Sequence, residues 1–225
     1  SMKKIQMVDL ISQYQKIKPA VDSAIMSVLE TAQFINGPEV RAFQSELEEY
    51  LGVNHVIPCA NGTDALQIAL MSLNLKPGDE IITTSFTFIA TTEVIALLGL
   101  KPIFVDVDKD TFCINAADIQ DAITPKTKAV MPVHYSGGVG ALDGIYAFAA
   151  NHGLRVIEDA AHAFGTEYQG KIVGGFGDIA CFSFDGIKNI TSGEGGCIVT
   201  NDEEVLRKVR DARLLGVEKD TEKRF

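Results

Sequence analysis

The chain has 225 residues, of which 46% are hydrophobic and 22% are charged, a balance typical of a folded globular protein with one large domain. Its net charge of −10 argues against the basic surface with which proteins bind nucleic acids and against adhesion to anionic membranes. No apolar run approaches the roughly 18 to 20 residues that span a bilayer. No signal-peptide pattern follows Lys4, so we expect a cytoplasmic protein without nucleic-acid or membrane partners.

Short apolar segments alternate with helical patterns along most of the chain. Because these segments are continuously apolar, we expect parallel strands that are covered on both faces. In chain order the expected elements are helices 22–31 and 39–51, strand 55–59, helix 64–73, strand 81–84, helix 90–98, strand 103–107, helix 116–122, strand 129–133, helix 143–151, strands 155–159, 178–184 and 197–200, and helix 203–214. The pattern predicts an α/β fold whose mostly parallel central sheet has helices on both faces, with ligands at the carboxyl ends of the strands.

The four cysteines, Cys59, Cys113, Cys181 and Cys197, form no C-x-x-C pair and have no zinc-site spacing. Three of them lie in apolar segments, where cysteine usually serves as a small buried side chain. We therefore expect reduced thiols and no metal site.

A first candidate site lies at Asn61, Gly62, Thr63 and Asp64, between an expected strand and an expected helix. The free amides and the dipole of a helix N-terminus bind anions such as phosphate. Gly62 would allow close approach to the backbone, and Thr63 would add a hydroxyl. The same residues also fit an ordinary capped helix start.

Two further candidates follow later strands. Asp159 ends strand 155–159, where an acid inside an apolar fold needs a cationic or hydrogen-bonding partner, such as a protonated pyridine nitrogen. Lys188 follows strand 178–184 in a glycine-bordered loop and is a candidate amine nucleophile. Taken singly, Asp159 fits a structural cap equally well, Lys188 fits a surface lysine, and the neighbouring His162 fits a core histidine.

Together these three features form the minimal set that binds pyridoxal phosphate (PLP). A lysine forms the Schiff base, an acid keeps the ring nitrogen protonated so that the ring accepts electrons, and a helix start holds the phosphate. Their chain order, with Gly62 and Thr63 before Asp159 and Lys188 last, is that of fold-type I PLP enzymes.

The chain resembles the DegT/DnrJ/EryC1/StrS family of sugar aminotransferases, whose fold is the large domain of fold-type I PLP transferases. The resemblance rests on motifs at residues 36–40 (NGPEV), 61–66 (NGTDAL), 85–91 (SFTFIAT), 132–135 (PVHY), 158–163 (EDAAHA) and 193–196 (GEGG). The family includes 3-dehydratases in which histidine replaces the Schiff-base lysine. Because this position is Lys188, the resemblance indicates an aminotransferase.

The resemblance implies roles for two catalytic residues and for the phosphate site. Lys188 would be covalently joined to PLP and would later move the proton, and Asp159 would pair with the ring nitrogen. Thr63, the amides of residues 62–64 and the hydroxyl of Ser183 would hold the phosphate.

The resemblance also implies contacts with the PLP ring. Phe88 would stack on the ring, with a core phenylalanine as the alternative. His162 stands where many relatives have glutamine near the ring hydroxyl.

The resemblance further implies transamination between glutamate, with 2-oxoglutarate as its product, and a nucleotide-linked keto sugar of amino-sugar or surface-polysaccharide biosynthesis. The strings at 158–163 and 187–191 favour amination at C4, with C3 as the alternative. The alternative hypotheses for its function are another fold-type I PLP enzyme and a non-catalytic regulatory domain. The absence of a cysteine loop suited to sulfur transfer counts against a desulfurase.

We divide the chain into an N-terminal helical segment, 1–35, and a PLP-binding large domain, 36–225. Family members are longer and continue into a small C-terminal domain. Their active sites are shared within a homodimer. We therefore expect the small domain to be missing from this chain and the chain to be poorly active by itself.

Overall fold

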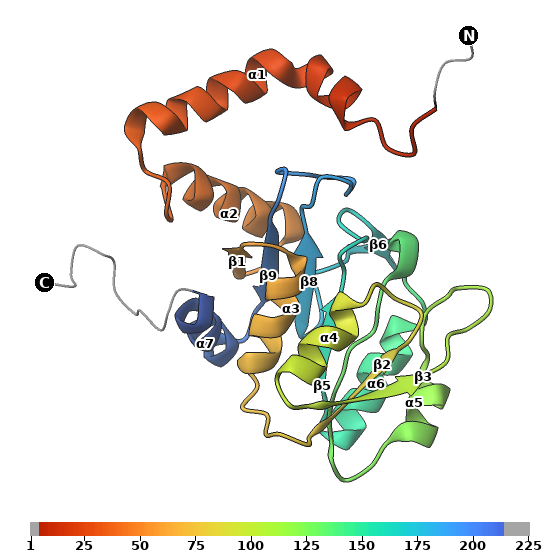
Figure 1. Cartoon of the computed structure of the whole chain (residues 1–225). Coiled ribbons are helices and arrows are strands. Elements are labelled where there is room, and N and C mark those ends of the chain that lie inside the picture. Colours follow the sequence, from red (N-terminus) through yellow and green to blue (C-terminus); the bar gives the residue numbers. More distant parts are fainter. Residues whose placement is uncertain (1–4, 214–225) are drawn as a thin grey trace, which may run out of the picture.

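The computed structural model describes residues 5–213, in which most helices pack against a seven-stranded sheet (Figure 1). The sheet order is β1-β9-β8-β5-β4-β2-β3. In chain order the elements are α1 (Leu10–Thr31), α2 (Pro38–Leu51), β1 (His55–Cys59), α3 (Gly62–Met71), β2 (Glu80–Thr84), α4 (Ala90–Leu97), β3 (Lys101–Val105), α5 (Ala116–Ala122), β4 (Thr127–Val130), the 3₁₀ turn η1 (Tyr135–Gly137), α6 (Leu142–His152), β5 (Arg155–Asp159), β6 (Glu167–Tyr168), β7 (Lys171–Ile172), β8 (Ile179–Ser183), β9 (Gly196–Thr200) and α7 (Glu203–Arg213).

The direction of the strands determines where the loops meet. β8, β5, β4, β2 and β3 run parallel, whereas β9 is antiparallel to both of its neighbours, β8 and β1. The mostly parallel sheet expected from the sequence is confirmed. Because β9 reverses direction, the segment 184–195 that joins β8 to β9 lies at the carboxyl end of β8, beside the carboxyl end of β5.

Apolar side chains cover both faces of the sheet. Helices α3, α4 and α7 pack on one face, and α2, α5 and α6 pack on the other. Ile81 and Ile82 are consecutive in β2 and belong to clusters on opposite faces, since successive side chains of a strand alternate. Burial on both faces is the physical reason for the continuously apolar strands in the sequence.

The largest difference from the expected elements is α1. It begins at Leu10 instead of residue 22, with the Asp9 side chain accepting a hydrogen bond from the Ser12 amide at 3.0 Å. Pro19 lies inside this helix, where it removes one backbone hydrogen bond. The helix nevertheless continues through it, so local rules underestimated its length.

The strand boundaries also shift. β3 begins two residues earlier than expected, and β4 ends at Val130 instead of 133. Val133 still forms an isolated parallel bridge with Asp159, so the chain beyond β4 follows β5 without a regular strand. The small pair β6 and β7 and the turn η1 were not expected, because elements of two or three residues have no periodic pattern to detect.

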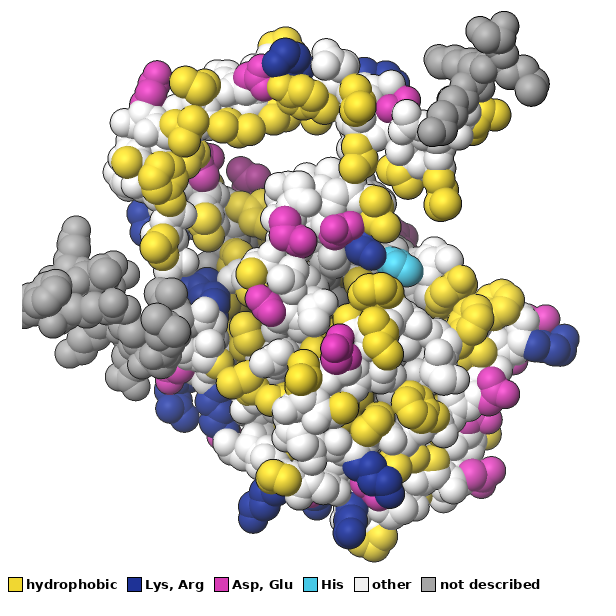
Figure 2. Space-filling model, in the orientation of Figure 1, with side chains coloured by type: hydrophobic (Ala, Val, Ile, Leu, Met, Phe, Trp, Pro, Cys, Tyr) yellow, Lys and Arg dark blue, Asp and Glu magenta, His cyan; other side chains and the backbone are white. Residues whose placement is uncertain are grey.

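Helix α1 lies apart from the rest of the molecule and contributes no buried residue (Figure 1). Figure 2 shows a hollow between α1 and the body, with hydrophobic side chains along its border. None of the helices within residues 5–213 combines the length and apolar character needed to cross a membrane.

All four cysteines are free thiols. Cys113, Cys181 and Cys197 are buried, which confirms the expectation of small buried side chains, and Cys59 is half-buried. Burial raises the pKa of the Cys59 thiol to about 12 and raises the pKa of the other three thiols as well. The thiolate, which is the nucleophile, is therefore disfavoured at all four positions.

Candidate active site

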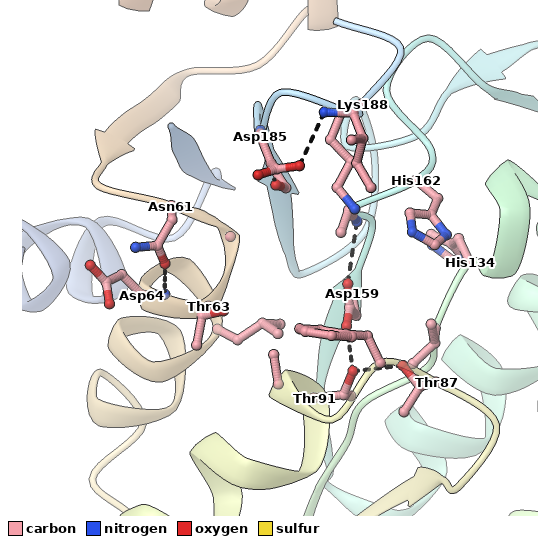
Figure 3. Close-up of a pocket in the computed structure, with 18 of the residues that line it drawn as sticks. Asn61, Thr63, Asp64, Thr87, Thr91, His134, Asp159, His162, Asp185 and Lys188 are labelled. Carbon is pink, nitrogen blue, oxygen red and sulfur yellow. Dashed lines mark hydrogen bonds between the residues drawn. The ribbon is translucent and has the colours of Figure 1, made fainter. Parts of the chain in front are cut away.

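A cavity of about 610 Å³ opens at the carboxyl ends of β5 and β8, next to the start of α3. Every site residue predicted from the sequence lines this cavity, although these residues come from distant parts of the chain (Figure 3). They are Gly62, Thr63, Asp64, Phe88, Asp159, His162, Ser183 and Lys188. The pocket has the size of a typical small-molecule site.

The start of α3 forms one wall of this pocket. The Asn61 side chain caps the helix by accepting a hydrogen bond from the Asp64 amide at 2.8 Å. The amides of Gly62 and Thr63 are first-turn donors without a partner inside the helix. The Asp64 amide, one of the three amides expected to bind phosphate, donates to this cap.

The close approach of α3 to β8 explains why residue 62 is glycine. A Cβ atom at Gly62 would lie 2.8 Å from Cβ and 3.3 Å from Oγ of Ser183, the last residue of β8. The glycine thus allows the start of α3 to approach the end of β8, and both Thr63 and Ser183 line the pocket.

Asp159 lies at the end of β5 with only 7% of its surface exposed. Its Oδ2 accepts a hydrogen bond from the Thr91 hydroxyl at 2.7 Å, and its Oδ1 accepts one from the Ala161 amide at 3.2 Å. Thr91 in turn lies 2.7 Å from the Thr87 hydroxyl (Figure 3). Thr87 and Thr91 were not predicted as site residues, although both stand in the 85–91 motif, four residues apart.

A second buried polar group lies beside Asp159 and was also missed. Glu158 is 0% exposed, and its Oε1 lies 2.7 Å from Nε2 of His134, which is 2% exposed and lines the pocket. Tyr146 donates to the other oxygen at 2.7 Å. Burial and the negative charge of Glu158 raise the pKa of the Tyr146 hydroxyl. This network explains how a strand next to the site accommodates two consecutive acids.

Lys188 extends from the β8–β9 segment into the pocket (Figure 3). Its backbone amide donates to the Asp185 carbonyl at 3.0 Å, which closes a tight turn after β8. None of the ion pairs formed among residues 5–213 involves its ammonium group. The segment ends near Gly193, whose φ of +84° is a conformation that favours glycine.

The His162 side chain is exposed and lines the pocket near Lys188. The Ser136 amide donates to its Nδ1 at 3.3 Å, so Nδ1 is unprotonated and the neutral ring has its proton on Nε2. Burial lowers the pKa of the imidazole, and the nearby charge of Lys188 lowers it further. His162 therefore presents a neutral N–H donor.

Phe88 lines the pocket but is 75% exposed. Its side chain is therefore not part of the apolar core, which was the alternative considered from the sequence. Among residues 5–213, no group of three or more His, Cys, Asp or Glu side chains is arranged to hold a metal ion.

Comparison with known proteins identifies the family. The profile of the DegT/DnrJ/EryC1/StrS aminotransferase family matches residues 15–225. This chain belongs to that family. The resemblance inferred from the motifs is thereby confirmed.

Similar proteins are found among sequences and among solved structures. The chain is 47% identical over 213 residues to UDP-N-acetyl-3-dehydro-alpha-D-glucosamine 3-aminotransferase of Acidithiobacillus ferrooxidans, covering 94% of this chain and 58% of the relative. It is 44% identical over 207 residues to UDP-2-acetamido-2-deoxy-3-oxo-D-glucuronate aminotransferase of Pseudomonas aeruginosa, covering 92% and 58%. DesV of S. venezuelae, solved with a ketimine intermediate, has a TM-score of 0.94 at 34% identity and is matched over 98% of this chain and 60% of its own.

The chain thus spans less than two thirds of the length of these DegT/DnrJ/EryC1/StrS relatives. The likeness to DesV covers the whole sheet and the pocket, and it confirms the fold-type I large domain expected from the sequence.

Proposed function

We propose that the protein transfers an amino group from glutamate to a nucleotide-linked keto sugar with the help of PLP. One observation carries the proposal. An amine on Lys188, a buried carboxylate on Asp159 and the free amides at the start of α3 surround a single cavity. These groups are distant in sequence, and each matches a different part of the cofactor.

The residues present fit PLP at three points. The Gly62 and Thr63 amides, with the Thr63 and Ser183 hydroxyls, would hold the phosphate. Asp159 would accept a hydrogen bond from the protonated ring nitrogen, and Lys188 would hold the cofactor covalently. When bound, PLP supplies an electron sink and carries the amino group between the two substrates.

The chain's own residues then perform the proton chemistry. Once freed, the Lys188 amine would take the proton from Cα of the amino donor and return it at C4′ of the cofactor, acting as general base and general acid. Asp159 would keep the ring nitrogen protonated throughout. The neutral Nε2–H of His162 would donate a hydrogen bond towards the ring hydroxyl.

For the sugar, we propose a uridine-diphosphate-linked keto sugar. The motifs alone favoured amination at C4, whereas two relatives above 40% identity are named for 3-keto sugars. We therefore favour C3 and retain C4 as the alternative. Side-by-side assays with a UDP-linked 3-keto and a UDP-linked 4-keto sugar distinguish the two, because only the true substrate gives stoichiometric 2-oxoglutarate.

We also propose a homodimer in which each active site is shared. The exposure of Phe88 beside the pocket supports a further protein surface over it, since an aromatic ring at the wall of a working site is usually covered. The four free thiols support a reducing compartment such as the cytoplasm. Light scattering coupled to gel filtration tests the dimer.

The central experiment is the visible absorption spectrum of the protein with PLP, before and after glutamate. A visible band that glutamate bleaches, together with borohydride trapping of the cofactor on the Lys188 peptide, is the expected result. Label spread over surface lysines, or a band that glutamate leaves unchanged, would contradict the proposal. Adding free alanine instead of free glutamate is the control for the choice of amino donor.

A further inference from the structure

The Thr91 hydroxyl is an unusual feature of the pocket, because it is buried and yet serves no backbone group. Thr91 is 1% exposed and lies in the first turns of α4. Its Oγ1 lies 2.7 Å from Oδ2 of Asp159 and 2.7 Å from Oγ1 of Thr87. The contact links α4 to the end of β5, two elements separated by 68 residues in the chain.

Counting protons fixes the direction of these hydrogen bonds. An ionised carboxylate only accepts hydrogen bonds, so the single Thr91 hydroxyl proton points to Asp159. Thr91 then has no proton left for Thr87, and Thr87 must be the donor between the two hydroxyls. With the carboxylate as the final acceptor, the relay runs from Thr87 to Thr91 to Asp159.

The carboxylate of Asp159 is held at both oxygens. Thr91 donates to Oδ2, and the Ala161 amide donates to Oδ1. Two donors from different elements fix the carboxylate plane, so that the remaining lone pairs are available to a group in the cavity. Hydrogen bonds to an ionised group are stronger than bonds between neutral groups. The two donors can therefore hold a negatively charged Asp159 carboxylate firmly in one orientation.

The next residue provides an internal comparison. The Thr92 hydroxyl donates to the Ile89 carbonyl at 3.1 Å, within its own helix turn, as threonine commonly does. Thr91 has the same side chain on the same helix, but its hydroxyl bonds to Asp159 instead. A purely helical role therefore explains Thr92 and does not explain Thr91.

We propose that Thr91, assisted by Thr87, is a positioning residue that holds the Asp159 carboxylate oriented towards the ring nitrogen of the cofactor. The inference rests on the proposed function, because it assigns a purpose to Asp159. Thr91 itself acts through Asp159 and forms no bond to the reacting atoms.

The test compares Thr91→Val, which removes the hydroxyl at nearly constant volume, with Thr91→Ser, which retains it. Thr92→Val removes the neighbouring hydroxyl and is the matched control. Three quantities are measured for each protein: the dissociation constant for PLP, the ¹⁵N chemical shift of the ring nitrogen in ¹⁵N-labelled PLP, and the melting temperature without cofactor.

Thr91→Val is expected to weaken PLP binding about tenfold, the usual effect of losing a hydrogen bond to a charged group, and to move the ¹⁵N signal towards the unprotonated nitrogen. Thr91→Ser restores both, and Thr92→Val changes neither. A Thr91→Val protein with a lower melting temperature but wild-type affinity and ¹⁵N shift overturns the inference, because Thr91 is then only structural.

Thr87→Val provides a second route if Thr91→Val does not fold. Removing the first donor of the relay is expected to shift the ¹⁵N signal in the same direction by a smaller amount, and an unchanged signal with unchanged affinity overturns the relay. Failure of the wild-type protein to bind PLP, or to react with glutamate, would instead contradict the proposed function, so the two failures are distinguishable.

Discussion

Asp159 and Lys188 face the same cavity from very different surroundings. Asp159 ends a central strand, is almost fully buried and has a hydrogen-bond donor at each carboxylate oxygen. Lys188 comes from the segment between β8 and β9, is only half-buried and forms none of the ion pairs found among residues 5–213. The side of the pocket that carries Asp159 is thus part of the sheet, whereas the side that carries Lys188 is a loop.

This difference matches what the two groups would have to do. A residue that keeps one proton at a fixed ring atom gains from a fixed carboxylate, since misorientation weakens the bond. A residue that is first attached to the cofactor and then moves a proton between two carbons needs freedom to swing. We therefore expect activity to be sensitive to loss of the hydrogen bonds that hold Asp159. On the Lys188 side, we expect it to be sensitive only to loss of the amine itself.

The largest effect is expected from Lys188→Ala, which removes the only proposed nucleophile and proton carrier. Turnover should fall to the background rate in a coupled assay for 2-oxoglutarate, while PLP still binds without a covalent bond. Lys171→Ala, at an exposed lysine in β7, is the matched control. Substantial turnover by Lys188→Ala would refute the assignment of the amine.

Asp159→Ala tests the Asp159 side of the pocket and should lower kcat by several orders of magnitude, because the ring nitrogen loses the carboxylate that keeps it protonated. Affinity for PLP should fall as well. Asp121→Ala, at an exposed position of α5, controls for loss of one negative charge. An Asp159→Ala protein within tenfold of wild-type kcat would be incompatible with the proposed role.

Gly62→Ala should have an intermediate effect on PLP binding and on stability. Its new Cβ would lie 2.8 Å from Cβ of Ser183, so α3 or β8 must move, at an overpacking cost of about 1–3 kcal/mol. The loss of PLP affinity should exceed the loss of stability of the cofactor-free protein, because the displaced amides belong to the proposed phosphate site. Gly144→Ala is the matched control, since its Cβ would meet Ala116 at an ordinary 3.8 Å. Equal effects of the two variants on PLP affinity would argue against a phosphate site at α3.

The smallest effect is expected from His162→Gln, and it concerns the pH dependence of stability. Glutamine retains a hydrogen-bond donor but has no group that titrates. The pKa of His162 is lowered from 6.5 in the folded protein, so the unfolded chain takes up this proton first as the pH falls. The stability contributed by neutral His162 is therefore complete above pH 6.5 and is lost as the pH falls through the lowered pKa. With falling pH through this range, the melting temperature of the wild type should fall relative to that of the variant, whose glutamine does not titrate. Parallel curves across this range would show that His162 is not the group responsible.

The sequence by itself determined the kind of fold and most of the site. Continuously apolar strands alternating with helices are a local pattern that requires a sheet covered on both faces, and residues that follow parallel strands necessarily meet at one edge. Gly62, Asp159 and Lys188 could therefore be placed together before any coordinates were known. The chemistry of an amine, an acid and a helix start then pointed to one class of cofactor.

Only the tertiary structure decided which groups support that site. The hydrogen bonds between Thr91 and Asp159 and between His134 and Glu158 join residues 68 and 24 positions apart, and no local pattern specifies such pairs. The same holds for the contact of Gly62 with Ser183, and for α1, whose length depended on how well one proline could be accommodated. Periodicity reports which face of an element is buried, whereas the partner of a buried polar group depends on how separate elements pack.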